Sequence, residues 1–198
     1  EMTGGDLKGF ALIQSENLFY PFQIVVFFLV LDFVQWLTHV TLHRIPFLWN
    51  FHKVHHSIKM MGFAGHLRYH WVENVIYTPV KFSAIILMGG FEPKHVFILY
   101  YLSILIGHIN HCNVKITYGP LKYLFNNPVM LIWHHAETIP KNYRYGVNFG
   151  ISLSLWDYLF KTAYMKKDGR DINLGFRNMD HFPETFLTQF IYPLNKRD

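Results

Sequence analysis

The stretch HVTLHRIPFLWNFHKVHHS, residues 39–57, places five histidines among leucine, phenylalanine and tryptophan. The whole chain of 198 residues has thirteen histidines and only one cysteine. Residues three or four apart share one face of a helix, so His39 with His43, and His52 with His55, can each grip one ion. The stretch therefore predicts helices that carry part of a metal site.

Further histidines follow later in the chain. His108 and His111 are three apart, whereas His134 and His135 are adjacent. Adjacent side chains point roughly 100° apart on a helix, so such a pair suits two metals better than one. Imidazole is a ligand of Fe, Zn, Cu or Ni. We therefore predict two metal ions, with the ligands drawn from His39, His43, His52, His55, His56, His108, His111, His134 and His135.

The remaining polar groups near these histidines have less specific interpretations. We expect His95 and His181 to be ordinary core residues. The segment LRYHWVE, residues 67–73, brings His70 and Glu73 close to the predicted site, and His66 lies just before it. These groups either orient ligand rings or belong to an interfacial belt. Asp32 shares a helix face with His39 and is expected to orient a ligand, or else to bond Gln35 or a neighbouring helix.

Composition and charge indicate a membrane protein. The chain is 51% apolar and only 16% charged, which is little charge for a soluble domain. Apolar runs predict membrane spans at about 19–43, 74–90 and 93–112, although buried helices of a soluble bundle are an alternative. With these spans, fifteen of the eighteen Lys and Arg residues fall on one side, which indicates the cytosolic face.

These observations predict one all-α domain over residues 1–198. It is an integral membrane helical bundle with a cytosolic, histidine-rich metal-binding cap. The net charge of +5 suits anionic lipid headgroups, and no nucleic-acid-binding motif is present. The single Cys112 excludes a disulfide framework.

The order of the histidine motifs resembles the fatty acid hydroxylase/sterol desaturase superfamily from residue 32 to about 162. HVTLH supplies the HX3H box and FHKVHHS the HX2HH box, and a later WHH follows. Asn148-Phe149-Gly150 matches the family's Asn-Tyr-Gly, and Trp156-Asp157 matches its Trp-Asp. Asn148 and Asp157 therefore join the expected groups around the site.

The resemblance implies a membrane-embedded, non-haem di-iron oxygenase. Such an enzyme uses two Fe ions, O2 and an external electron donor, cytochrome b5-like or ferredoxin-like, to hydroxylate or desaturate a lipid C–H bond. It implies a bacterial inner membrane or endoplasmic reticulum, with the active site facing the cytosol. Family members commonly have four spans, so we expect a membrane helix to precede this chain.

One position departs from the family pattern. The last histidine box is also HX2HH, but Leu131 stands where its first histidine belongs. Leucine cannot bind a metal. Either the site has one ligand fewer, or water or another residue such as His70 substitutes, or the protein is weakened or inactive.

Two other functions compete with the oxygenase. A membrane zinc hydrolase needs a carboxylate as general base beside the metal-bound water, and Glu73 and Glu137 are the candidates. A non-catalytic metal-binding protein that kept the fold is the other, and Leu131 favours it. Zinc in a purified protein would not exclude iron, since imidazole sites accept both.

Overall fold

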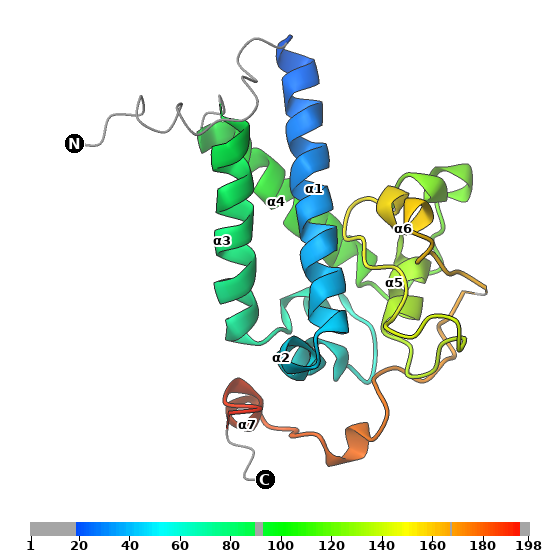
Figure 1. Ribbon diagram of the computed structural model, residues 1–198. Helices are drawn as coiled ribbons and strands as arrows, with labels where there is room; N and C mark the ends of the chain where they lie inside the picture. Colours follow the sequence, from blue (N-terminus) through cyan, green and yellow to red (C-terminus); the bar gives the residue numbers. More distant parts are fainter. Residues whose placement is uncertain (1–18, 90–92, 167, 195–198) are drawn as a thin grey trace.

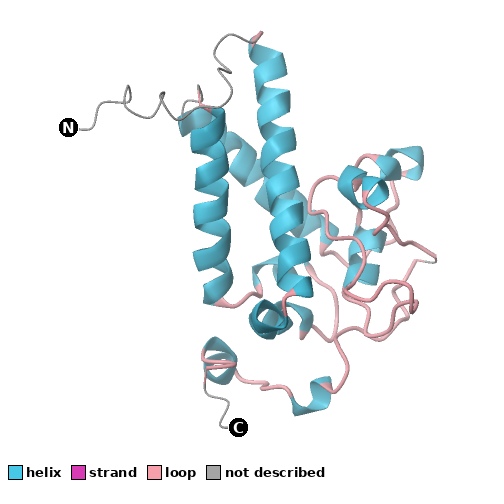
Figure 2. Cartoon of the chain, in the orientation of Figure 1, coloured by secondary structure: helices cyan, strands magenta, loops and turns pink. Residues whose placement is uncertain are grey.

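The computed structural model describes residues 19–89, 93–166 and 168–194. Within them the helices are α1 Tyr20–Arg44, α2 Pro46–His56, η3 Phe63–Leu67, α3 Trp71–Met88, α4 Pro93–Asn110, η4 Gly119–Tyr123, α5 Pro128–His134, α6 Leu155–Leu159, η5 Met179–His181 and α7 Phe186–Phe190. No strand forms in these ranges beyond two isolated bridges. The all-helical class is confirmed for the described residues (Figures 1 and 2).

Three long helices form the main body. α1 and α4 run toward the end of the body where α2 lies, and α3 starts there and runs back (Figure 1). Their bounds match the three expected spans in position. By length and composition α1 could cross a membrane, with 25 residues and a mean hydropathy of 1.8. Among the described helices it alone meets that criterion, so crossing by α3 and α4 stays a prediction.

The break between α1 and α2 follows from one dipeptide. Ile45 precedes Pro46 and takes an extended conformation, with φ −92° and ψ 114°, because the proline ring disfavours helical geometry at the preceding residue. Pro46 then occupies the first turn of α2, where its missing N–H costs nothing. The part of residues 39–57 that follows Ile45 therefore starts a new helix, α2, and does not continue α1.

Side-chain caps fix where the next helices begin. The ring of His70 accepts a bond from the N–H of Val72, and the Glu73 carboxylate accepts from the N–H of His70, so the two form a capping box for α3. Asn127 accepts from the N–H of Met130 and caps α5 at 3.1 Å. Both helices therefore begin at the histidine-rich end.

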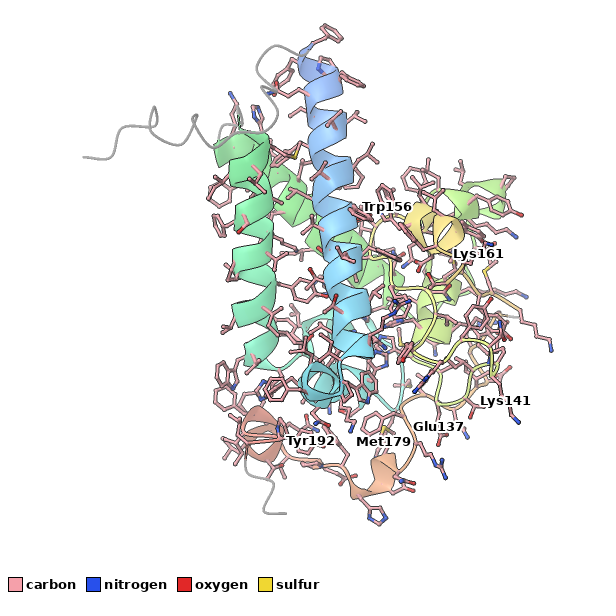
Figure 3. The ribbon with its side chains drawn as sticks, in the orientation of Figure 1. Glu137, Lys141, Trp156, Lys161, Met179 and Tyr192 are labelled. Carbon is pink, nitrogen blue, oxygen red and sulfur yellow. The ribbon has the colours of Figure 1, made fainter. Side chains whose placement is uncertain are left out.

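The segment after α5 is fastened to α1 by two reciprocal bonds. Trp36 Nε1 donates to Asp157 Oδ1 at 3.0 Å, and Trp156 Nε1 donates to Asp32 Oδ2 at 2.9 Å. Figure 3 shows Trp156 between α6 and α1. Asp32 was expected to orient a ligand histidine or to bond Gln35 or a neighbouring helix. Its partner is Trp156 of α6, which agrees with the alternative of a bond to a neighbouring helix, so Asp32 anchors α6.

Gly150 allows the chain to turn tightly within this segment. A Cβ there would collide with the backbone carbonyl oxygen of Leu153. Backbone cannot move aside as a flexible side chain can. We expect Gly150→Ala to lower the free energy of unfolding by about 1–3 kcal/mol, measured as thermal unfolding in detergent. Gly62→Ala is the matched control, because no atom lies within 4 Å of the added Cβ, and equal stability of the two variants would contradict the prediction.

Candidate metal centre

Eight of the nine predicted ligands gather in two groups at the α2 end of the body. The first group is His39, His43, His52, His56 and His134, and the second is His55, His111 and His135. Within each group one ring nitrogen per residue lies within 4.8 Å of the others. Helices α1 and α2 and the ends of α4 and α5 supply them. Except for the half-buried His43, all eight are buried.

Adjacent histidines fall in different groups. His55 and His56 separate, and so do His134 and His135. The two groups nevertheless touch, because the ring centroids of His56 and His135 are 4.6 Å apart. This arrangement suits two neighbouring ions, as the 100° argument expected. Metal binding by these residues stays a prediction.

Most of these rings are held through Nδ1. A backbone carbonyl oxygen faces Nδ1 in five of them, and a carboxylate faces it in the sixth. Because a carbonyl oxygen only accepts, that Nδ1 carries the proton, and the neutral ring then presents a bare Nε2 lone pair. The pairs are His39–Phe149 at 2.7 Å, His43–Tyr145 at 3.1 Å, His55–Arg68 at 2.8 Å, His111–Gly107 at 2.6 Å, His134–Val147 at 2.7 Å and His52–Glu73 at 2.8 Å.

The bare Nε2 atoms face one another. The Nε2–Nε2 distance is 3.4 Å for His55–His111, whose Nδ1 atoms both face carbonyls. It is 3.1 Å for His39–His52, where the Glu73 carboxyl and not a carbonyl faces Nδ1 of His52. Two acceptors at that distance repel unless a cation lies between them. Protonation does not supply it at neutral pH, because burial lowers the pKa of His52 and of His55 to about 3.

A metal ion fits this arrangement. Zinc–imidazole bonds of about 2.0–2.1 Å allow two coordinating nitrogens to lie about 3 Å apart. The Nε2 of His134 and both ring nitrogens of His135 are buried without a hydrogen-bond partner. Such groups are costly unless something binds them. The residues present therefore fit two imidazole-bound metals.

Two side chains from the sequence motifs, Asp157 and Asn148, hydrogen-bond the backbone around the rings. Asp157 accepts from the N–H groups of Phe149 and Gly150 at 2.9 and 2.8 Å, and burial raises its pKa. It thereby fixes the peptide whose carbonyl holds His39. Asn148, at φ 54°, donates to the carbonyl of Met130 at 2.8 Å and ties this loop to α5. Both residues position ligands without touching them.

Three predicted residues lie outside both groups. His108 bonds through Nδ1 to the carbonyl of Phe63 at 2.7 Å, although it is three residues before His111. The ring of His66 lies 5.0 Å from that of His111, against Gly107, where a Cβ would collide with it. His70 caps α3, so its Nδ1 does not face a metal.

The two histidines set aside as core residues differ. His95 is buried and its Nε2 lies 2.6 Å from the Tyr20 hydroxyl, as expected of a core residue. His181 is exposed on η5. The expectation of a core position was wrong for His181, because the segment that carries it packs through Phe182 instead.

Leu131 lies in an apolar wall beside the second group. Its side chain is 1% exposed and packs with Ile58, Met61 and Ile132. Ile58 and His111 both border Gly65, so this wall adjoins His111. The second group has three histidines and the first has five. The absence of a histidine at position 131 is therefore consistent with the smaller number of histidines in the second group.

The sequence did not reveal the backbone groups that hold the rings. The carbonyls of residues 68, 107, 145, 147 and 149 carry this role, and a carbonyl has no signature in a sequence. Trp36 was also missed as a partner of Asp157. Its signal was its position four residues after Asp32, which places both on one helix face.

Comparisons with known proteins agree with the motifs. The fatty acid hydroxylase family profile matches residues 24–162. An ornithine lipid hydroxylase of Rhizobium tropici is 26% identical over 177 residues, 89% of this chain and 51% of the relative. A very-long-chain aldehyde decarbonylase of Oryza sativa subsp. indica is 25% identical, over 76% of this chain and 58% of the relative. Sphinganine C4-monooxygenase 2 of Arabidopsis thaliana is 22% identical, over 89% and 67%.

The chain therefore spans about half the length of the first two relatives. No solved structure matches it significantly.

Because the two groups differ in their number of histidines, we expect substitutions of the neighbours His55 and His56 to change the metal content differently. His55→Ala leaves two histidines in the second group, too few to hold an ion, so the metal content should fall from two ions to about one. His56→Ala leaves four in the first group and should keep both ions with weaker affinity. Elemental analysis of the purified variants measures this, with exposed His181→Ala as control. Equal metal content in the two variants would contradict the division into groups.

Proposed function

The chain belongs to the fatty acid hydroxylase family, and from this premise we propose that it is a di-iron oxidoreductase acting on a C–H bond of a membrane lipid. The observation that carries the proposal is the pair of buried histidine groups with facing Nε2 atoms. The first group would hold one iron and the second the other. Bound iron supplies O2 activation, so that one oxygen atom enters the lipid as an alcohol and the other leaves as water, with two electrons and two protons consumed.

The chain's own residues position and shield this chemistry. Glu73 holds His52 and the carbonyl of Phe149 holds His39, so the rings cannot turn away. The rings of Trp49 and Phe149 lie 4.9 and 5.0 Å from that of His43 and cover the first group. These rings keep water from the sides of His43 that they contact, which protects reactive species there from side reactions.

An external electron donor is part of the proposal. A cleft of about 420 Å³ opens on His43, His56 and His134, and Lys53, Arg144 and Arg177 line it. No carboxylate is among its lining residues. A positive cleft attracts a negatively charged protein, which supports an acidic donor of the cytochrome b5 or ferredoxin kind. The Lys and Arg distribution supports a membrane location with this face in the cytosol.

The zinc hydrolase is less well supported. Glu73 is engaged by His52 and by the cap of α3, and Glu137 is exposed. Neither histidine group includes a carboxylate among the described residues. A general base beside a metal-bound water is therefore missing from both groups. A non-catalytic metal protein stays the alternative that Leu131 favours.

The proposal predicts iron-dependent incorporation of oxygen into lipid. Protein reconstituted anaerobically with iron should bind two ions, and with a reductant and ¹⁸O2 it should place labelled oxygen in a lipid of the host membrane, detected by mass spectrometry. A desaturase would instead give an unlabelled alkene. Reconstitution with zinc is the control. Full iron loading and electron supply without any oxidised lipid would favour the non-catalytic alternative.

Leu131→His tests whether this position limits the second group. The residue is one turn before His134 and His135 and borders His111 through Ile58. A histidine there should add a ligand, so iron should bind more tightly and lipid oxidation should rise. Leu131→Met, which keeps the apolar volume, is the matched control. Equal iron affinity and equal turnover in all three proteins would show that the position does not face a metal.

A further inference from the structure

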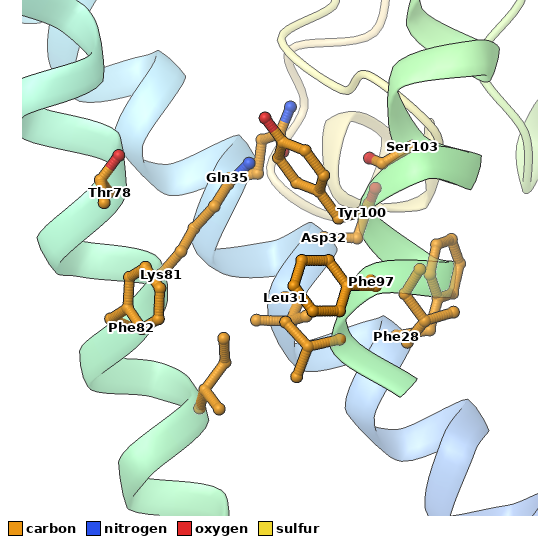
Figure 4. A pocket seen from close by; sticks show the side chains of 13 residues that line it. Phe28, Leu31, Asp32, Gln35, Thr78, Lys81, Phe82, Phe97, Tyr100 and Ser103 are labelled. Atoms are coloured by element: carbon orange, nitrogen blue, oxygen red, sulfur yellow. The ribbon is translucent and has the colours of Figure 1, made fainter. Parts of the chain in front are cut away.

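An apolar chamber of about 350 Å³ lies between α1, α3 and α4 (Figure 4). That volume is in the range of small-molecule binding sites. Its walls extend from Phe28 to Gln35 on α1, from Thr78 to Ile85 on α3, and from Val96 to Ser103 on α4. Each wall covers seven residue steps, or about 10 Å of helix. The chamber is therefore elongated along the helices.

Polar and apolar residues separate along the chamber. α1 and α4 end near the histidines and α3 begins there. Gln35, Thr78 and Ser103 consequently line the end next to the histidines, whereas Phe28, Ile85 and other apolar residues line the far end. A chamber that is polar at one end and apolar at the other matches a molecule with an apolar chain and one polar group.

The polar end adjoins the first histidine group. A smaller cavity of about 80 Å³ is lined by His39, His52 and His55, and Gln35 lines both this cavity and the chamber. Gln35 lies four residues before His39, one turn along the same face of α1. A bound molecule at Gln35 would therefore lie next to His39 and His52.

Lys81 places a cation at the same end. It lines the chamber, and its Nζ lies 5.5 Å from the ring centroid of Tyr77, which lines the smaller cavity. In Figure 4 the polar ends of Lys81, Gln35 and Tyr100 point to the same part of the chamber. Asp32 is the one acidic residue in the lining, and its carboxylate accepts from Trp156. Asp32 also attracts the Lys81 ammonium electrostatically. An ammonium has three N–H donors and an amide has two, so Lys81 and Gln35 can each still donate to an oxygen atom at this end.

We propose that this chamber binds one acyl chain, with its carbonyl-type oxygen held by Gln35 and Lys81 and its first carbons facing His39 and His52. The inference rests on the proposed function and narrows its substrate to lipids oxidised close to an acyl carbonyl group. The tail would lie at the Phe28 and Ile85 end. A carboxylate, an ester and an amide share this oxygen chemistry.

Photo-crosslinking tests the orientation without requiring metal or turnover. Hexadecanoic acid with a diazirine about eight carbons from the carboxyl group, the length that spans the chamber of about 10 Å, is the tail probe and should label residues around Ile85 and Val96. A diazirine near the carboxyl group should label residues around Asn74 and Tyr77. Ile85→Trp should abolish labelling by the tail probe, because it fills the far end of the chamber. Ile86→Trp, at the adjacent position outside the lining, should leave labelling unchanged. Reversed labelling, or equal effects of the two substitutions, would overturn the inference.

Binding competition tests the polar end. Hexadecanoic acid and hexadecanamide should displace the probe about tenfold better than hexadecane, since each gains a hydrogen bond to a charged donor. Lys81→Met and Gln35→Leu should remove that advantage, while the distant Lys122→Met should keep it. Tighter binding of the acid would identify free fatty acids, and tighter binding of the amide would identify N-acyl lipids. If hexadecane binds as tightly as the acid and the amide, the inference is overturned. Loss of iron binding would overturn only the proposed function.

Discussion

The structure depends on one electrostatic constraint: buried neutral imidazoles that face each other through bare Nε2 atoms. Each carbonyl bond at Nδ1 decides which nitrogen keeps its proton, and therefore makes the inner nitrogen an acceptor. A cluster of acceptors about 3 Å apart is unfavourable in a low-dielectric interior, where unpaired polar groups are costly. A cation relieves this repulsion for every ring at once. The geometry that makes the cluster unfavourable alone is the geometry that fits a metal ion.

Loops of the C-terminal half hold the histidine rings in this arrangement. The carbonyls of Tyr145, Val147 and Phe149 come from one short segment and hold three rings of the first group. The residues between them, Gly146 and Asn148, have positive φ angles of 122° and 54°, so a tightly folded loop presents these three carbonyls. Asp157 bonds the N–H groups at the end of this segment and Trp36 of α1. One carboxylate thereby couples the position of the segment to the helix that carries His39.

The sequence predicted those parts that depend on local geometry. The separation of His55 from His56 follows from the 100° step of a helix. The helix break at Pro46 also follows from chain stereochemistry, but it was not predicted from the sequence. The sequence could not separate His108 from His111, because the spacing of three permits both to bind one ion. Only the fold brings the carbonyl of Phe63 to His108. In the same way, sequence reasoning placed Asp32 in a predicted span but could not identify its partner Trp156, which lies 124 residues later.

The two openings of the histidine site differ in chemistry as well as in position. His39, His52 and His55 border the small cavity that shares Gln35 with the apolar chamber, whereas His43, His56 and His134 border the basic cleft. No histidine is shared between these openings. An apolar molecule and a negatively charged protein could therefore approach the same pair of groups at the same time without competing. For the proposed oxygenase that separation would matter, because electrons must arrive while the substrate excludes water from the reacting carbon.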